Sequence, residues 1–319
     1  QDDSYFKAAL EIERLPSVAR MRQRMDAHAA DYQEAVKAAN HSFLEQLQVP
    51  ITPISTGHVP LDMDLFPQDN SKSHKEGVSR TYKGMDGYGV FGIYIGEEGW
   101  NLAADLRQGK DHAQNGFLEL FQETLTRARQ LTPLPLLGRL DSAHDALENR
   151  VEFYQRDFDY ILKWNPRRKN GHYWLDYAID LGHRAHWECP RPGKRVATFT
   201  IYEEQVYKDC CYTFRRVMRV VERTIDKRGN SLLLPDIEVE GWWTSLELPD
   251  AQIIALYAAH GTSEQFHSEF KTDLDLERLP SGKLATNRLV MELGCFIYNI
   301  LRWIGLHGQE LSWTNTSYN

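Results

Sequence analysis

Cysteine is scarce in this chain, and its few cysteines are not spaced for a metal site. The 319 residues contain four, and none of them form a Cys-x-x-Cys pair. Structural zinc sites use such closely spaced pairs, so we expect no zinc site. We expect buried or half-buried free thiols, as in a reducing cytosol. The four are Cys189, Cys210, Cys211 and Cys295.

Long apolar runs are also absent. No run reaches the ~18 residues that span a membrane, and no basic and then apolar signal sequence opens the chain. We therefore expect a cytoplasmic protein with no membrane partner. The chain begins at Gln1 rather than Met, and we expect a fragment or a processed form.

An overall excess of positive charge is missing too, since the net charge is −8. The distribution is uneven, however, because residues 161–230 carry 15 Lys and Arg against 8 Asp and Glu. A basic block inside an acidic protein is typical of a local phosphate-binding surface. A salt-bridged, solvated β-region is the alternative interpretation, and charge alone does not separate the two.

The order of predicted elements indicates a ribonuclease-H-like α/β fold. Alternation predicts a strand at 61–65, a hairpin of strands at 88–95 and 100–107, and strands at 135–140 and 160–164, with helices at 113–131 and 143–156. This β-β-β-α-β-α-β order differs from a doubly wound fold, which alternates from its start. We expect a helical segment at 1–55, a catalytic core at 56–170 and 249–319, and an all-β insertion at 171–248.

One stretch near the end of the chain is unusually rich in chemistry. Tyr257, His260, Glu264 and Lys271 stand at offsets 0, +3, +7 and +14, which places them on one face of a helix. The face combines a carboxylate with groups suited to phosphates. The alternative is an ordinary solvated helix face, and Gly261 weakens a continuous helix.

Three aspartates could act with Glu264. Asp62 and Asp64 lie two apart on a predicted strand, so both point to the same face. Asp141 ends the apolar run 135–140, at the strand end where ligands bind in open sheets. The alternatives are a solvent-facing strand side for Asp62 and Asp64 and a helix N-cap for Asp141. In the ribonuclease-H order the first and fourth strands are neighbours, so Asp64 and Asp141 would lie side by side. Two Asp and one Glu are suited to two Mg²⁺ ions that promote phosphoryl displacement.

The chain resembles the DDE transposases of bacterial insertion sequences, in particular the Y-R-E-K group and its "thirteen-eighty" family. The matching segments extend from about residue 5 to the end of the chain. They are Leu-Asp-Met-Asp at 61–64, Asp-Asn-Ser at 69–71, Lys-Glu-Gly-Val-Ser-Arg-Thr-Tyr-Lys-Gly at 75–84, Asp-Gly-Tyr at 86–88, Leu-Leu-Gly-Arg-Leu-Asp-Ser at 136–142, Glu-Gln-Phe-His-Ser-Glu-Phe-Lys at 264–271, Leu-Pro-Ser-Gly-Lys at 279–283 and Tyr-Asn-Ile-Leu-Arg at 298–302.

The resemblance implies a role for each residue. Asp64, Asp141 and Glu264 would be the metal-binding triad, with Asp62 as the fallback for the first position. Tyr257 and Lys271 would contact DNA phosphates, as would His260, which stands where the family has Arg and lacks its bidentate fork. In the insertion the resemblance implies further DNA contacts, and the candidates are Arg215, Arg216, Arg219, Arg223, Trp242 and Trp243. A Trp there could stack on an unpaired base, or it could be part of the core.

The resemblance further implies a DNA transposase that uses Mg²⁺, with Mn²⁺ as a substitute. It would hydrolyse the ends of its element and join the freed 3′-hydroxyl to target DNA, working as a homodimer on double-stranded terminal repeats in a bacterial cytoplasm. Two alternatives stay open at this point. One is a ribonuclease-H-like nuclease without strand transfer, and the other is a non-catalytic DNA-binding derivative.

Overall fold

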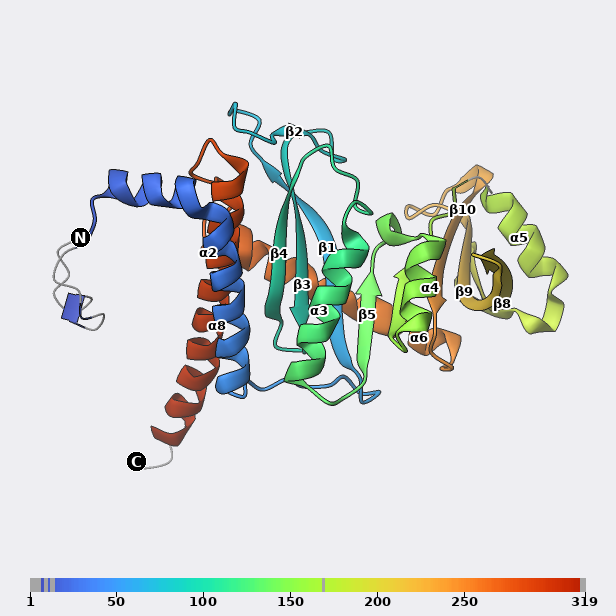
Figure 1. Ribbon diagram of the computed structural model, residues 1–319. Helices are drawn as coiled ribbons and strands as arrows, with labels where there is room; N and C mark the ends of the chain where they lie inside the picture. Colours follow the sequence, from blue (N-terminus) through green and yellow to red (C-terminus); the bar gives the residue numbers. More distant parts are fainter. Residues whose placement is uncertain (1–6, 9–10, 12–14, 168–169, 316–319) are drawn as a thin grey trace.

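The computed structural model describes residues 7–8, 11, 15–167 and 170–315 of the chain. Its centre is a mixed ten-stranded sheet in the order β2-β3-β1-β5-β6-β10-β9-β8-β7, with β4 also paired to β3. The strands of the first half are β1 (Val59–Asp69), β2 (Ser79–Arg80), β3 (Asp86–Ile95), β4 (Trp100–Gln108), β5 (Leu136–Leu140) and β6 (Asp159–Lys163). Figure 1 shows them at the centre of the molecule.

The predicted adjacency of the first and fourth core strands is confirmed. β1 pairs antiparallel with β3 on one side and parallel with β5 on the other, and β5 pairs parallel with β6. The hairpin of β3 and β4 is also confirmed, with Gly96 and Gly99 at φ 77° and 71° in its turn. These positions favour glycine because it alone adopts positive φ without strain. The core is thus a mixed α/β sheet consistent with the ribonuclease-H-like order.

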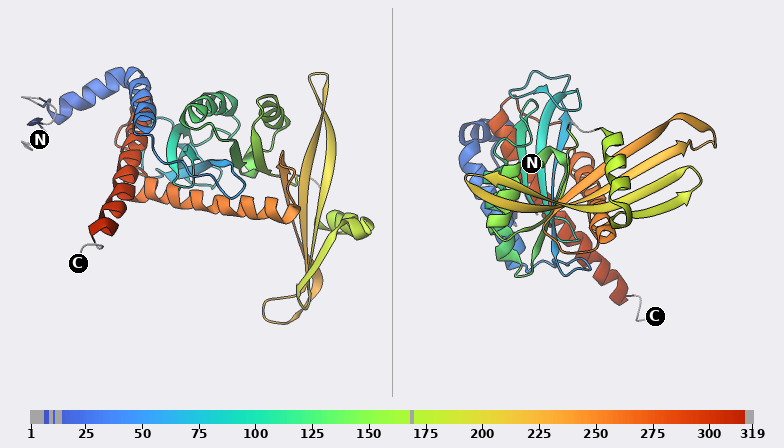
Figure 2. Two further views of the ribbon diagram at one scale, coloured as in Figure 1. Left: turned by 90° about the horizontal axis from the view of Figure 1, so that it is seen from below. Right: turned by 90° about the vertical axis from the view of Figure 1, so that its right-hand side faces the viewer.

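Helices cover both faces of this sheet. On one face lie α3 (Phe117–Leu131) and α4 (Leu147–Gln155), preceded by the 3₁₀ turn η1 (Ser142–His144). On the other face runs the segment of α6 (Asp250–Ala258), η3 (Ala259–Gly261), α7 (Thr262–Ser268) and the π-turn η4 (Glu269–Asp273). Figure 2 shows this segment, in orange, extending along the sheet from the insertion toward the termini.

Alternation along β1 assigns its side chains to these two faces. Met63 and Leu65 pack in the cluster that contains Phe117 of α3. Phe66 packs in the other cluster, with Phe266 of α7. Asp62 and Asp64 share the parity of Phe66, so they face the segment that carries Glu264.

The insertion differs from the all-β prediction. It contains the helix α5 (Gly171–Asp180) as well as β7 (His186–Arg191), β8 (Lys194–Tyr207), β9 (Cys210–Ile225) and β10 (Ser231–Thr244). The Asn170 side chain caps α5, and Trp174, Leu175 and Ala178 are buried beneath it. The strands are not separate from the core, because β10 pairs with β6 and continues the same sheet.

The cysteines are free, but their burial differs from the prediction. Cys295 is buried, whereas Cys189, Cys210 and Cys211 are exposed. Two of the exposed thiols start β9, after a tight turn in which Lys208 and Asp209 adopt positive φ. The thiols therefore lie at the solvated tip of a hairpin.

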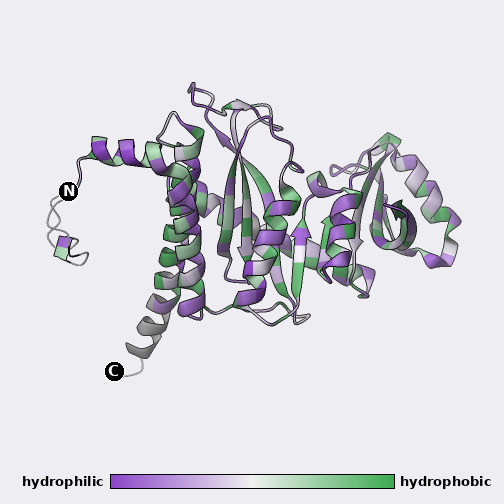
Figure 3. Cartoon of the chain, in the orientation of Figure 1, coloured by the Kyte–Doolittle hydropathy of each residue, from purple (hydrophilic) through white to green (hydrophobic). Residues whose placement is uncertain are grey.

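Two long helices lie side by side at one end of the molecule (Figure 1). They are α2 (Val18–Gln46), kinked at His28, and α8 (Leu284–Asn315). The first part of the helical segment expected at 1–55 falls largely outside the described residues. The part of α2 that extends away from the body is mostly hydrophilic (Figure 3).

Residues 284–307 of α8 form one helix that is long and apolar enough to cross a membrane by length and composition. The sequence prediction had found no such run. Charged residues such as Glu292 interrupt the apolar residues of this helix, whose mean hydropathy is nevertheless 1.4. Because α8 packs on α2 and β4, part of its apolar surface belongs to the protein core. The absence of a membrane partner stays a prediction.

Candidate active site

Asp64 and Asp141 lie at neighbouring strands, as the sequence predicts. The β1–β5 register pairs Asp62 with Arg139 and Met63 with Leu140, so Asp64 and Asp141 are the next residues along the two strands. Asp141 directly follows β5 and caps η1, where its Oδ1 accepts a hydrogen bond of 3.1 Å from the backbone N–H of Ala143. Asp141 therefore both caps η1 and lies next to Asp64.

The electrostatics of the two carboxyl groups are unfavourable in the absence of a cation. Burial and, after it, the charge of Asp141 raise the pKa of Asp64 to about 6. Burial also raises the pKa of Asp141. Beside them, burial and both aspartates raise the pKa of Tyr82 to about 12. Two close carboxylates that resist ionisation are a suitable pair of oxygen ligands for Mg²⁺ or Mn²⁺, and on this observation they fit such an ion.

Asp62, the fallback ligand, is engaged elsewhere. Its two oxygens accept hydrogen bonds of 2.6 and 2.7 Å from Nε and Nη2 of Arg139, and His260 Nδ1 lies 2.9 Å from Oδ1. Arg139 and His260 hold the pKa of Asp62 below its usual range. Arg139 also donates to the carbonyl of Leu256 at the end of α6. This buried cluster fastens the helical segment to β1 and engages both oxygens of Asp62, which makes Asp62 a weaker candidate than Asp64 for a metal ligand.

Glu264 is not joined to the two aspartates. It is exposed at the start of α7, and the part of the chain that the structure describes contains no group of three His, Cys, Asp or Glu side chains that could hold a metal ion. The single long helix expected over 257–271 is divided by the 3₁₀ turn at 259–261 and the π-turn at 269–273. These irregular turns shift the helical phase, so regular spacing did not predict the direction of each side chain.

Two buried histidines beside the aspartates were missed in the sequence. His267 Nδ1 lies 3.7 Å from Asp64 Oδ2, and His144 Nε2 lies 3.8 Å from Asp141 Oδ1. Burial lowers the pKa of each imidazole to about 3. The only signal in the sequence for His267 was its place within the stretch that contains Glu264 and Lys271.

The other residues of the signature stretch lie near the aspartates. Tyr257 is half-buried, and its pKa is raised by burial and by the charges of Asp141 and Asp64. Lys271 lies over the ring of Phe66 at 5.1 Å, and burial lowers the pKa of its ammonium group. His260 is buried against Asp62, which is not the solvent-facing position that a phosphate contact needs.

The predicted DNA contacts of the insertion need correction, because the structure buries or pairs them. Arg215 is 9% exposed and donates to the carbonyl of Leu248 and to Asp250, each at 2.8 Å. Trp242 and Trp243 are each 2% exposed, which agrees with the core alternative. Such long, cationic or aromatic side chains can cover core surface, and charge counting along the sequence does not detect this.

The remaining arginines of this set form ion pairs along the β9–β10 ladder. Arg219 Nη1 lies 3.2 Å from Glu240, and Arg223 Nη1 lies 3.0 Å from Asp236. Cross-strand pairs of opposite charge stabilise a sheet. These two arginines therefore fit the alternative interpretation of the basic block, which is a salt-bridged β-region.

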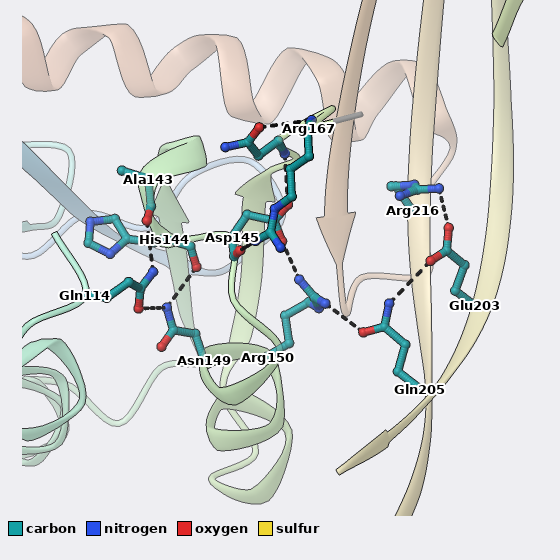
Figure 4. Close-up of polar contacts among 11 residues, drawn as sticks. Gln114, Ala143, His144, Asp145, Asn149, Arg150, Arg167, Glu203, Gln205 and Arg216 are labelled. Atoms are coloured by element: carbon teal, nitrogen blue, oxygen red, sulfur yellow. Dashed lines mark hydrogen bonds and ion pairs between the residues drawn. The ribbon is translucent and has the colours of Figure 1, made fainter. Parts of the chain in front are cut away.

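Arg216 belongs to a partly buried chain of polar groups that joins the region after Asp141 to the insertion. Figure 4 shows Asp145 accepting from Arg150, which donates to Gln205 at 2.7 Å; Gln205 and Arg216 both bond to Glu203. The guanidinium of Arg216 also lies 4.5–5.2 Å from the ring centres of Trp164, Trp174 and Trp243.

The same figure shows how the turn after Asp141 is held from its other side. Gln114 donates to the carbonyl of Ala143 at 2.9 Å, and Asn149 donates to Gln114 and to the carbonyl of His144 at 2.9 and 2.8 Å. The turn that contains Ala143 and His144 is thus fixed by side chains that precede α3 and by side chains on α4. This support orients Asp141 without contacting its carboxylate.

A hollow of about 550 Å³ opens beside Asp141. Arg80, Lys110 and His112 give it cationic or proton-accepting groups, and Tyr82 forms part of its wall. The Tyr82 hydroxyl donates to the carbonyl of Leu65, next to Asp64. The hollow therefore joins Asp141 to the cations Arg80 and Lys110.

Comparison with known proteins places this geometry in a family. A comparison with curated proteins gave no match. Among solved structures, the chain is similar to the piggyBac transposase in a synaptic complex with hairpin DNA, at 11% identity and a TM-score of 0.37 over 81% of this chain and 49% of that one. The chain thus spans about half of that protein's length. The family described as "Transposase DDE domain group 1" matches residues 1–316, so the chain belongs to the DDE transposases of this group.

Proposed function

We propose that the protein is a DNA transposase that hydrolyses one phosphodiester at each end of its element and transfers the freed 3′-hydroxyl into target DNA. The observation that supports this most strongly is the pair Asp64 and Asp141, set on neighbouring strands with raised pKa values in a chain of the DDE family. Family membership supports DNA transposition, and the pair of carboxylates supports the metal-dependent chemistry.

The two aspartates would hold Mg²⁺, with Mn²⁺ as a substitute, through oxygen atoms only. When bound, two such ions activate the attacking oxygen and stabilise the leaving oxygen of an in-line displacement. In hydrolysis the oxygen of water bonds to phosphorus and the 3′-oxygen leaves with a proton. In transfer that 3′-hydroxyl attacks a target phosphodiester, so each bond formed replaces one broken.

The substrate strand would enter through the hollow beside Asp141. Arg80 and Lys110 would contact the phosphates there, and Lys271 would approach from the side of Asp64. These cations take over the role that the sequence had assigned to the insertion arginines, because phosphate contacts need accessible charge. The insertion would then act through its buried link to the turn after Asp141 and not through Arg215 or Arg216.

Glu264 remains our proposed third ligand, although it is exposed here. It lies on the same segment between His260 and His267, which both contact aspartates of β1. A small rotation or approach of α7 toward β1 would bring its carboxylate to Asp64. Catalytic contacts are often looser before substrate binds. A homodimer bound to two element ends is part of the same proposal, and it rests on the family resemblance.

The test is an assay of end DNA and a target plasmid with the purified protein in Mg²⁺. We expect cleavage at the element's 3′ ends and joined products. Cleavage without joining would support the nuclease alternative, and end binding without either reaction would support the non-catalytic one. Asp64→Asn and Asp141→Asn should each abolish both reactions while end binding persists.

A further inference from the structure

His267 is the side chain of the helical segment nearest to Asp64. Its Nδ1 lies 3.7 Å from Asp64 Oδ2, and 7% of its side chain is exposed. The ring packs against Phe66 at 4.3 Å and against Tyr94 at 5.4 Å between ring centres. Two aromatic rings and the sheet thus fix the imidazole in a position from which one nitrogen faces a proposed metal ligand.

The other nitrogen identifies the tautomer. Among the described residues, no hydrogen-bond partner reaches the buried Nε2 of His267. A buried N–H without an acceptor is rarer in proteins than an under-satisfied acceptor. A neutral imidazole has only one N–H, so the proton belongs on Nδ1. His267 then presents a donor, and not a metal-binding lone pair, to Asp64.

We propose that His267 is a positioning residue that donates Nδ1–H to Asp64 Oδ2 and so directs the other carboxylate oxygen at the metal and Asp141. The inference rests on the proposed function, since it concerns the metal ligand Asp64. The 3.7 Å separation is longer than a hydrogen bond, and a small shift of the Asp64 carboxylate toward the fixed imidazole would form it.

The rest of the helical segment is also held in place. His260, seven residues before His267, already lies 2.9 Å from Asp62, and Arg139 donates to the backbone carbonyl of Leu256 just before it. These contacts hold the α6 end of the segment to β1, and Phe266 and Phe270 are buried in the core at its α7 end. His267 and Asp64 are the polar pair at that end.

Two substitutions separate positioning from packing. His267→Phe keeps a ring of similar shape between Phe66 and Tyr94 but has no donor. His267→Asn restores a side-chain N–H near the place of Nδ1 with a smaller side chain. His28→Phe, on the exposed part of α2, controls for the loss of one histidine that could bind metal ions. Thermal unfolding of the full chain first establishes that each variant is folded.

The readout is Mn²⁺ binding, followed by the electron paramagnetic resonance signal of free Mn²⁺, with the Mg²⁺ dependence of end cleavage measured beside it. Loss of a group that orients a metal ligand typically weakens binding about 10–100-fold. We expect that loss in His267→Phe, recovery to within about threefold in His267→Asn, and no change in His28→Phe. In His267→Phe, end cleavage should also require a higher Mg²⁺ concentration, with little change in its maximal rate.

Wild-type Mn²⁺ affinity in His267→Phe would overturn the inference, and so would an Asn variant as weak as the Phe variant. Absence of any Asp64-dependent Mn²⁺ binding in the wild-type protein would overturn it as well. If wild-type protein binds Mn²⁺ through Asp64 but cleaves no end DNA, the proposed function fails alone, and the Mn²⁺ titrations still decide the role of His267.

Discussion

The substitution Asp64→Asn should stabilise the metal-free protein at neutral pH while it destroys activity. Folding raises the pKa of Asp64 from 3.8 to about 6, because the carboxylate is buried beside Asp141. A carboxyl group whose folded pKa is raised costs stability as pH increases through that range, since the unfolded chain ionises more easily. At about 1.4 kcal/mol for each pKa unit, the loss amounts to about 3 kcal/mol by pH 8. Asparagine keeps the shape and carries no charge.

The assay is guanidinium-induced unfolding between pH 4 and pH 8 in the presence of EDTA. The stability of Asp64→Asn relative to the wild-type protein should increase by about 2.4 kcal/mol across this range. Asp31→Asn, on α2, controls for the removal of one negative charge far from the site. Adding Mg²⁺ at pH 8 should stabilise the wild-type protein and leave Asp64→Asn unchanged. A stability difference that is the same at pH 4 and pH 8 would refute the electrostatic reasoning.

Three further predictions follow from individual contacts. Arg139→Met should destabilise the protein by about 3–5 kcal/mol in chemical unfolding, because it leaves the Asp62 carboxylate buried without its partner. Adding Asp62→Leu should recover most of that loss of stability. A double variant whose loss equals the sum of the two single losses would contradict this. Gly99→Ala should lower both stability and cleavage, because its Cβ would lie 2.3 Å from the Phe266 ring on α7, and unchanged thermal unfolding would show that the contact relaxes freely. Lys110→Glu should weaken end-DNA binding and reduce the dependence of log K on log salt by about one phosphate contact; an unchanged slope in a binding titration would exclude Lys110 from the DNA interface.

The sheet was predictable because its signals are local and strong. Alternation in β1 and the turn with Gly96 and Gly99 each specify their own strand, and the order of elements then places β1 beside β5. Asp64 and Asp141 follow from that order, because each lies at a known place on its strand. The pairing of distant aspartates therefore required topology and no knowledge of side-chain packing.

Side-chain direction and partner choice were less predictable. Regular spacing over 257–271 treats the segment as one helix, whereas the 3₁₀ turn at 259–261 changes its phase before Glu264 and the π-turn at 269–273 changes it again before Lys271. The arginines of β9 looked like a phosphate-binding surface because sequence shows their charge but not their partners. Arg215 and Arg216 find carbonyl, carboxylate and tryptophan neighbours that come together only in the folded chain. The helix α5 was not predicted, because it is short and is followed by the long strands that dominate the pattern of the insertion.

The most direct test of the account compares three variants in one cleavage assay on end DNA with Mg²⁺ and with Mn²⁺. The account predicts that Asp64→Asn, Asp141→Asn and Glu264→Gln each lose cleavage by at least about a thousandfold, with folding and end binding preserved. Full cleavage by Asp64→Asn or Asp141→Asn would contradict the proposed catalytic pair. Full cleavage by Glu264→Gln alone would instead show that the exposed position of Glu264 in this structure is its working position.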